Sequence, residues 1–125
     1  MSVINKTRYI KIDGTKVGVI TMLYDKGHFG IGVSLCNTKI DKFDKDEGKL
    51  LAYNRAVDCL DKNPLLLKDI GNLSLSKIET IGGFKFPRNT YEADMKVCIF
   101  LEAYCLLVDD MVYTLALSKV RAETE

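Results

Sequence analysis

Residues 29–56 limit the possible folds of this chain more than any other part of the sequence. They begin with the apolar run FGIGVSLC, continue through the polar run NTKIDKF and end in DKDEGKLLAYNRA. This order predicts a strand, a loop and a helix in succession. Gly30 and Gly32 leave alternate positions of the strand without side chains, which indicates either a bulge or an element packed close to the backbone.

Two further strands are predicted ahead of this stretch, and short turns separate all three. The strands are residues 8–13, 16–24 and 28–36, with turns at Asp13-Gly14 and at residues 25–27. Turns this short join neighbouring antiparallel strands. We therefore expect a three-stranded antiparallel meander.

The helix that follows has sequence signals at both ends. Asp44 has the side chain of an N-cap, and Glu47 completes the spacing of a capping box. Proline disfavours helical geometry in the residue before it, so the helix should end at Asn63-Pro64. One side of the helix is apolar, and we expect this stripe to cover the sheet: Leu50, Tyr53, Ala56, Val57 and Leu60.

A second helix is predicted from Asn89, an N-cap candidate with Glu92 three residues on. Its first apolar stripe comprises Ala93, Val97, Phe100, Tyr104, Val108, Met111 and Leu115. A second stripe, nearly opposite, comprises Met95, Ile99, Leu106, Tyr113 and Leu117. Such a helix must be covered on two sides, which suggests the sheet on one and a second copy of the chain on the other. After Asp109-Asp110 the helix either continues or gives way to a strand over residues 111–117.

Residues 78–87, between the two helices, predict one broken strand or a hairpin centred on Gly82-Gly83. The 125 residues are typical of one domain, which we place over residues 1–125. The sequence therefore predicts an α+β fold in which an antiparallel sheet of three to five strands packs against two helices. We expect this domain to form a homodimer or a higher homo-oligomer.

Charge and cysteine usage argue against several functional classes. The chain has 18 Lys and Arg against 17 Asp and Glu, so it lacks the basic excess of a nucleic-acid-binding protein. No CxxC pair occurs among the cysteines, so a structural zinc site is not expected; the cysteines are Cys36, Cys59, Cys98 and Cys105. We predict no other metal and no cofactor. All four lie in apolar runs, where a free cysteine behaves as a small hydrophobic residue, and we expect a reducing, cytoplasmic compartment. The most apolar run, residues 97–108, is shorter than the roughly 20 residues of a membrane span.

No catalytic set stands out in the sequence. The only histidine, His28, lies beside a turn, and roughly 26 Å of extended chain separates it from Cys36. A thiol nucleophile activated by this histidine within one strand is therefore excluded. Two carboxylate pairs occur in capping or charged surroundings and are interpreted as solvated: Asp44 with Asp46, and Asp109 with Asp110.

Two groups of residues suit the binding of an anion and a ring. The first lies on the polar loop and on the side of the helix away from its apolar stripe. The second is FKFPRN, which combines aromatic and basic side chains just before a predicted helix N-terminus, where anions are favoured and rings can stack. The candidate ligand-binding residues are Asn37, Lys39, Lys42, Asn54, Arg55, Phe84, Phe86, Arg88 and Asn89. Two alternatives stay open: Arg55 pairs with Asp58, and the phenylalanines belong to the core.

The strand–loop–helix stretch also carries a pattern known from one family. It contains Gly32-x-Ser34-x-Cys36, then Asp41-x-Phe43, then a helix with Gly48 that ends in Arg55-Ala56. This pattern resembles the Thoeris anti-defence proteins, phage sponges that sequester cyclic ADP-ribose isomers made by bacterial TIR-domain enzymes. The resemblance covers residues 32–56, and Asn37-Thr38 stands where such proteins often have serine-proline.

The resemblance implies a binding protein that is not an enzyme and that acts in the cytoplasm of an infected bacterial host. It also implies at least a dimer, with ligand pockets at the subunit interface. The ligand would carry adenine, riboses and a pyrophosphate, which Arg55 and a lysine could neutralise. Two other functions stay open: an interaction protein that docks on and inhibits a host defence enzyme, and a hydrolase of the same signal that uses His28 or the carboxylates.

Overall fold

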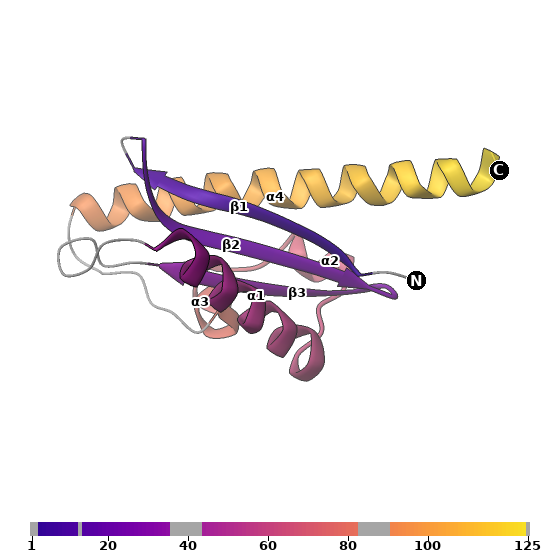
Figure 1. The fold of residues 1–125 in the computed structure, drawn as a ribbon, viewed down its shortest axis with the longest axis horizontal. Helices are drawn as coiled ribbons and strands as arrows, with labels where there is room; N and C mark the ends of the chain where they lie inside the picture. Colours follow the sequence, from indigo (N-terminus) through magenta and orange to yellow (C-terminus); the bar gives the residue numbers. More distant parts are fainter. Residues whose placement is uncertain (1–2, 13, 36–43, 83–90, 125) are drawn as a thin grey trace.

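The computed structural model describes residues 3–12, 14–35, 44–82 and 91–124, and it has the predicted α+β architecture (Figure 1). Within these residues one three-stranded antiparallel sheet is combined with four helices, where the sequence predicted two. The elements are β1 (Ile4–Ile12), β2 (Thr15–Asp25), β3 (His28–Leu35), α1 (Lys45–Lys62), α2 (Leu67–Ile70), α3 (Leu75–Gly82) and α4 (Tyr91–Thr124).

The sheet is the predicted meander, with the strands in the order β1-β2-β3. Gly14 and Gly27 have φ angles of 79° and 88°, so the two turns use backbone geometry that glycine adopts without strain. The only register shift in the pairing of β1 with β2 falls between Ile10 and Lys11. The glycines of β3 are therefore not part of a bulge, because their pairing with β2 is regular.

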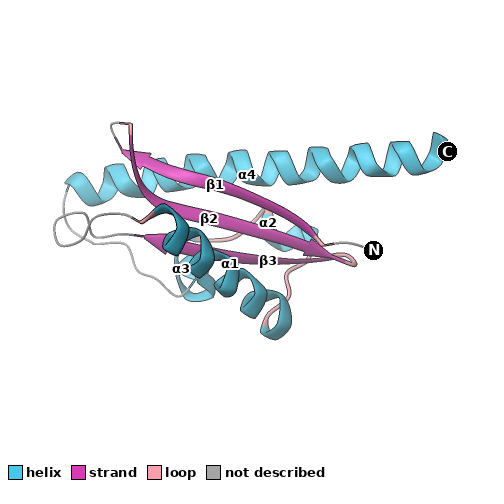
Figure 2. Cartoon of the chain, in the orientation of Figure 1, coloured by secondary structure: helices cyan, strands magenta, loops and turns pink. Residues whose placement is uncertain are grey.

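Helices cover both faces of this sheet (Figure 2). Successive residues of a strand point to opposite faces, so Ile31 and Val33 of β3 share one face and Gly30 and Gly32 share the other. The face with Ile31 and Val33 forms a core cluster with Phe100 of α4. The face with the glycines lies under α1.

α1 packs on the sheet through its smallest side chains. Its buried residues are Gly48, Ala52, Ala56 and Cys59. A Cβ atom at Gly32 would overlap the carbonyl oxygen of Ala52, and one at Gly30 would lie 2.9 Å from the Cβ of Leu60. The prediction of an element packed close to the β3 backbone is thus confirmed.

The apolar stripe predicted to cover the sheet from α1 is wrong in two of its members. Leu50 is 61% exposed and Tyr53 is 41% exposed, whereas Ala56 is fully buried. The helix has turned its small side chains inward, because glycines in β3 leave room there for the helix backbone. Its end signals are confirmed: the Asp44 carboxylate accepts hydrogen bonds from the backbone N–H groups of Asp46 and Glu47, and Asn63 is the C-cap.

Two predictions about the second half of the chain are also wrong. The first part of the predicted strand or hairpin at residues 78–87 belongs to α3, while residues 83–87 lie outside the described residues. α4 continues through Asp109-Asp110 to Thr124, so residues 111–117 are helical. Aspartate costs a helix interior less than about 0.7 kcal/mol, and both side chains are exposed, so the pair does not interrupt the helix.

Three residues of the first stripe of α4 are buried as predicted, with Phe100, Tyr104 and Met111 at 6% exposure or less. Three more are partly buried against the core: Val97, Val108 and Leu115. The Tyr104 hydroxyl donates a 2.6 Å hydrogen bond to the carbonyl oxygen of Ile70, which fastens α2 to α4. Burial raises the pKa of this phenol well above its usual value of 10.0, and the neighbouring Cys105 thiolate would add to the shift. The N-cap predicted at Asn89 lies outside the described residues.

Candidate functional site

The outer edge of β3 is covered by other parts of the chain. Phe29 exchanges two backbone hydrogen bonds with Leu65, of 2.7 and 2.9 Å. The Arg55 guanidinium of α1 donates through Nη1 to the Val33 carbonyl oxygen at 2.6 Å. An open edge strand would expose unpaired backbone groups, so these contacts satisfy groups that could otherwise recruit a foreign strand.

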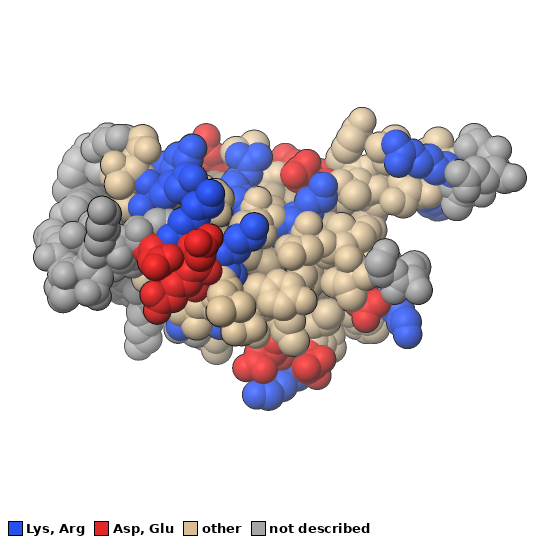
Figure 3. Space-filling model, in the orientation of Figure 1, with Lys and Arg blue, Asp and Glu red and all other residues tan. Residues whose placement is uncertain are grey.

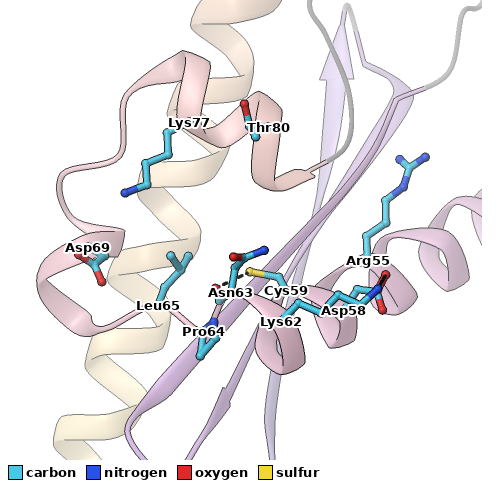
Figure 4. Close-up of a pocket in the computed structure, with 10 residues that line it drawn as sticks. All are labelled: Arg55, Asp58, Cys59, Lys62, Asn63, Pro64, Leu65, Asp69, Lys77 and Thr80. Atoms are coloured by element: carbon cyan, nitrogen blue, oxygen red, sulfur yellow. Dashed lines mark hydrogen bonds and ion pairs between the residues drawn. The ribbon is translucent and has the colours of Figure 1, made fainter.

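A pocket of about 590 Å³ lies beside this edge, and we call it the edge pocket (Figure 4). The C-terminal half of α1 forms one wall and α3 forms the opposite wall, with the segment after α1 and α2 between them. Small-molecule pockets typically measure about 300–1,000 Å³, so the edge pocket has the size for a nucleotide. Its lining includes Arg55, Cys59, Lys62, Asn63, Leu65 and Lys77.

Positive charge in the edge pocket comes from two walls. Arg55 and Lys62 belong to α1 and Lys77 belongs to α3; in Figure 4 the Lys77 side chain extends toward the side of Asp69, whereas Arg55 points in a different direction. Lys62 forms an ion pair with Asp58 at 3.6 Å. Both side chains are about 70% exposed, so solvent screens the pair and the attraction is weak. Within the described residues Lys77 has no carboxylate partner, so its ammonium group is available to an anion.

The two carboxylates of the lining are already engaged. Asp58 pairs with Lys62, and Asp69 accepts a 2.9 Å hydrogen bond from the backbone N–H of Leu66 at the start of α2. Each therefore offers less to a cation than its charge alone suggests. The pocket as a whole has three cationic and two acidic side chains, which favours an anionic ligand.

The floor of the edge pocket contains the buried thiol of Cys59. Its Sγ donates to the Asn63 carbonyl oxygen at 3.6 Å. Burial raises the pKa of the Cys59 thiol above its usual value, and a hydrogen bond with the Ile31 backbone offsets this only in part. Since the thiolate is the nucleophilic form, Cys59 is protonated and unreactive at neutral pH.

The sequence-predicted ligand residues fall into two groups. Asn54 is exposed on α1, and Arg55 is half-buried at the edge pocket. The others lie outside the described residues: Asn37, Lys39, Lys42, Phe84, Phe86, Arg88 and Asn89. The described residues that flank them, at the end of β3 and the starts of α1 and α4, lie toward the same end of the molecule in Figure 1.

Other side chains singled out in the sequence are also located. Asp58 pairs with Lys62, and Arg55 bonds to the β3 backbone, so the alternative Arg55–Asp58 pair is wrong. His28 is exposed beside the turn, as predicted. Cys59 is buried, whereas Cys98 and Cys105 are exposed on α4.

Figure 3 shows charges of both signs on the face that carries α1, with acidic side chains at the start of that helix. Among the described residues, no group of three or more potential ligands could hold a metal ion. Nor does any described helix have the length and apolarity required to cross a membrane.

Sequence reasoning missed Lys62, Asn63 and Lys77 as pocket residues. Asn63 was used only as the sign of a helix end, and Lys62 and Lys77 were not singled out. These residues meet because α3 folds back against α1, a contact between segments that no local pattern reveals.

Comparisons with family models, with curated proteins and with solved structures found no match to this chain. Its function is therefore inferred from its own residues. Two features are relevant: the edge pocket, and the anion- and ring-binding residues predicted from the sequence.

Proposed function

We propose that this protein is a phage anti-defence protein that binds and sequesters a cyclic ADP-ribose-type immune signal without cleaving it. It would act in the cytoplasm of an infected bacterium, as a homo-oligomer. The observation that best supports this function is the edge pocket, which is large enough for a nucleotide and presents cationic side chains from two opposite walls. It adjoins Arg55, the last basic residue of the stretch that resembles the anti-defence family.

The ligand chemistry matches the residues available. A cyclic ADP-ribose-type signal carries two negative charges on its pyrophosphate, for which Lys77 and Lys62 supply ammonium donors. Phe84 and Phe86, predicted from the sequence, supply rings that can stack on adenine for about 1–3 kcal/mol per base. Arg55 would act chiefly by holding the pocket wall, because its Nη1 already bonds to β3.

Sequestration requires tight binding of the signal and no catalytic turnover. A sponge lowers the free concentration of a signal only if it binds more tightly than the host effector does. Nanomolar affinity corresponds to about −12 kcal/mol, which requires many simultaneous contacts. Enclosure of the ligand by the edge pocket, the two predicted loops and a second chain would supply them.

Titration calorimetry of the full chain against cyclic ADP-ribose, its isomers and other cyclic nucleotides tests the proposal. We expect tight binding of at least one of them and, for Lys77→Ala, at least tenfold weaker binding, because a charged hydrogen bond contributes about 1.5–3 kcal/mol. Lys68→Ala is the matched control: Lys68 is an exposed lysine of α2 outside the pocket lining. Absence of binding to the whole panel, or equal binding by both variants, would contradict the proposal.

A second function, inhibition of a host defence enzyme by docking on it, is favoured by one observation. Leu106, Tyr113 and Leu117 of α4 form an exposed apolar stripe, with 42%, 67% and 36% exposure. Such a stripe suits a protein–protein contact. Mass measurement in solution discriminates the two, since a lone monomer would favour docking on a foreign partner.

A further inference from the structure

The two edges of the sheet differ in how far their backbone groups are satisfied. The outer edge of β3 is closed by contacts with Leu65 and Arg55. β1 forms the opposite edge, because the strand order is β1-β2-β3 (Figure 1). Among the described residues, no group outside the sheet hydrogen-bonds to the β1 backbone. β1 is therefore the edge that can still accept a further strand.

The strand pairing shows which backbone groups of β1 point away from the sheet. Phe29 directs its N–H and C=O groups outward to Leu65, so the pair of Phe29 with Tyr24 is not hydrogen-bonded. Tyr24 therefore bonds to Ile4, and hydrogen-bonded pairs alternate with the other kind along β1. Three residues of β1 consequently present both backbone groups outward: Asn5, Thr7 and Tyr9.

Basic side chains alternate with these outward groups. Ile10 belongs to the core cluster with Phe100 of α4, so the even-numbered residues of β1 point to the face that α4 covers. Lys6 and Arg8 are two of them, and both are half-buried. Neither has an ion-pair partner among the described residues, and β1 contains no acidic residue. A strand added to β1 thus meets two positive charges that are not neutralised.

The other face of β1 borders a groove of about 270 Å³. α1 packs mainly on β3 and β2, which leaves β1 bare on this side. The groove is lined by Asn5 and Thr7 of β1 and by the exposed Leu50 and Tyr53 of α1, among others. A strand beside β1 extends the floor of this groove, so alternate side chains of that strand face its apolar wall.

The charges of β1 disfavour a second copy of the chain as the added strand. Antiparallel pairing of two β1 strands about Thr7 places Lys6 of one copy opposite Arg8 of the other, and like charges directly opposite are destabilising. A strand with acidic residues at alternate positions places opposite charges there instead. Lys6 and Arg8 occupy pairs that would not be hydrogen-bonded to the new strand, and facing side chains are closest in such pairs.

We propose that β1 binds an extended acidic peptide of a partner protein as a fourth, antiparallel strand of the sheet. Two acidic residues of the peptide lie opposite Lys6 and Arg8, and the apolar residue between them faces Thr7 and the groove. This goes beyond the proposed function by naming a second binding surface and its partner. It uses no residue of the edge pocket, so its tests contain no nucleotide, and their failure is distinct from failure to bind a signal.

Fluorescence anisotropy of labelled peptides with the full chain at physiological salt tests the charge requirement. The acidic probe is Thr-Thr-Glu-Val-Glu-Thr-Thr with capped ends, and the basic probe has lysine in place of both glutamates. We expect saturable binding of the acidic probe and at least about tenfold weaker binding of the basic one. Lys6→Glu combined with Arg8→Glu should reverse this preference.

Lys68→Glu combined with Lys119→Glu is the matched control, because it changes the net charge equally at exposed positions outside β1. It should keep the preference of the unsubstituted chain, and circular dichroism checks that both double variants fold. No binding of the acidic probe would overturn the proposal and leave Lys6 and Arg8 as charges that only protect an open edge. Equal binding of both probes would overturn it as well. So would displacement of the acidic probe by an equal concentration of single-stranded oligothymidylate, which would assign this edge to nucleic acid.

N-methylated probes test strand addition without altering the protein. In the proposed pairing the N–H of the central valine donates to β1, whereas the N–H groups of the two glutamates point away from it. N-methylation of the valine should weaken binding at least about tenfold, and N-methylation of the first glutamate less than about threefold. Equal weakening by both would overturn binding as a strand.

Discussion

α1 and α4 cover opposite faces of one sheet, but they pack on it by different means. α4 inserts large side chains, such as Phe100 and Met111, between itself and the strands. α1 brings its backbone against β3, where Gly32 leaves room and Ala52 and Ala56 are the contacting residues. The contact of α4 with the sheet therefore depends on large side chains that fill the space between them. The contact of α1 depends on the missing side chains of the β3 glycines, which let the helix backbone come close.

The difference explains why an apolar stripe identified the buried face of α4 but not that of α1. A strand with large side chains leaves grooves that only large side chains of a helix can fill. A strand with alternate glycines is flat, and a helix gains more dispersion contacts there by approaching with its smallest residues. Leu50 and Tyr53 then remain on the outside of α1.

The largest expected effect comes from placing a side chain under α1. Gly32→Val puts a Cβ into the position of the Ala52 carbonyl oxygen, so α1 must move away from the sheet. We expect the loss of most of the folding free energy, which for a domain of this kind is about 5–15 kcal/mol. Urea unfolding followed by circular dichroism measures it.

Gly71→Ala is the matched control for that variant. Gly71 has a φ of −82°, and a Cβ there would have no heavy atom nearer than 4.0 Å. We expect a change in unfolding free energy of less than about 0.5 kcal/mol. Equal destabilisation by both glycine substitutions would refute close packing of α1 on β3.

Removal of a large side chain should weaken the packing of α4 on the sheet. Phe100 is fully buried, so Phe100→Ala creates a cavity and should lower the unfolding free energy by about 3–5 kcal/mol. The measurement is the same urea titration. A loss below 1 kcal/mol, on the scale of surface substitutions, would contradict a core built from α4 side-chain volume.

Tyr104→Phe should have an intermediate effect. It removes the hydroxyl and leaves the buried carbonyl oxygen of Ile70 without its donor, which costs about 1–3 kcal/mol. Thermal and urea unfolding at neutral pH measure this loss. An unchanged stability would show that the hydrogen bond does not hold α2 to α4.

The same variant also predicts a pH dependence. The phenol ionises near pH 10 in the unfolded chain, but its raised pKa keeps it protonated in the folded one. Above pH 10 the folded state therefore binds more protons than the unfolded state does. The free energy of unfolding then falls as the pH rises, by at most about 1.4 kcal/mol per pH unit. Tyr104→Phe should remove this part of the slope, so the two curves should converge above pH 10.

The smallest effect is expected on the outside of α1. Leu50 belongs to the stripe that the sequence predicts as core, yet it is 61% exposed. Leu50→Ala should therefore change the unfolding free energy by less than about 0.5 kcal/mol. A loss of 2 kcal/mol or more, typical of a core leucine, would restore the sequence-based stripe and refute the packing described here.

Much of the fold follows from local signals in the sequence. The turns at Gly14 and Gly27 need positive φ angles, and the cap at Asp44 needs only its own neighbours, so all three are predictable. The glycines of β3 predicted close packing correctly. Which side of α1 fills that space depends on a contact between segments, and sequence periodicity alone does not determine it.

Local features of the sequence also explain why α3 and the second half of α4 were predicted wrongly. α2 has only four residues, too few to show an apolar period, and α3, although amphipathic, begins only a few residues after it. Asp109-Asp110 suggested a break in α4 because aspartate is a weak helix former. The apolar face on the sheet continues past this pair to Met111, and its burial outweighs the local preference.

Less of the candidate site than of the fold could be predicted from the sequence. Arg55 was predicted from the strand–loop–helix pattern and does line the edge pocket, although one of its donors holds the edge of β3. Lys77 was not predicted, because its relevance depends on how α3 folds against α1. A binding site made by distant segments is visible only after folding is known.

Recovery of ligand after denaturation tests sequestration most directly. The protein is incubated with a cyclic ADP-ribose-type signal until none remains free, then denatured, and the released nucleotide is identified by mass spectrometry. Sequestration predicts that the signal is recovered intact and in stoichiometric amount. Recovery of a hydrolysed product, or a signal that stays free throughout, would contradict it.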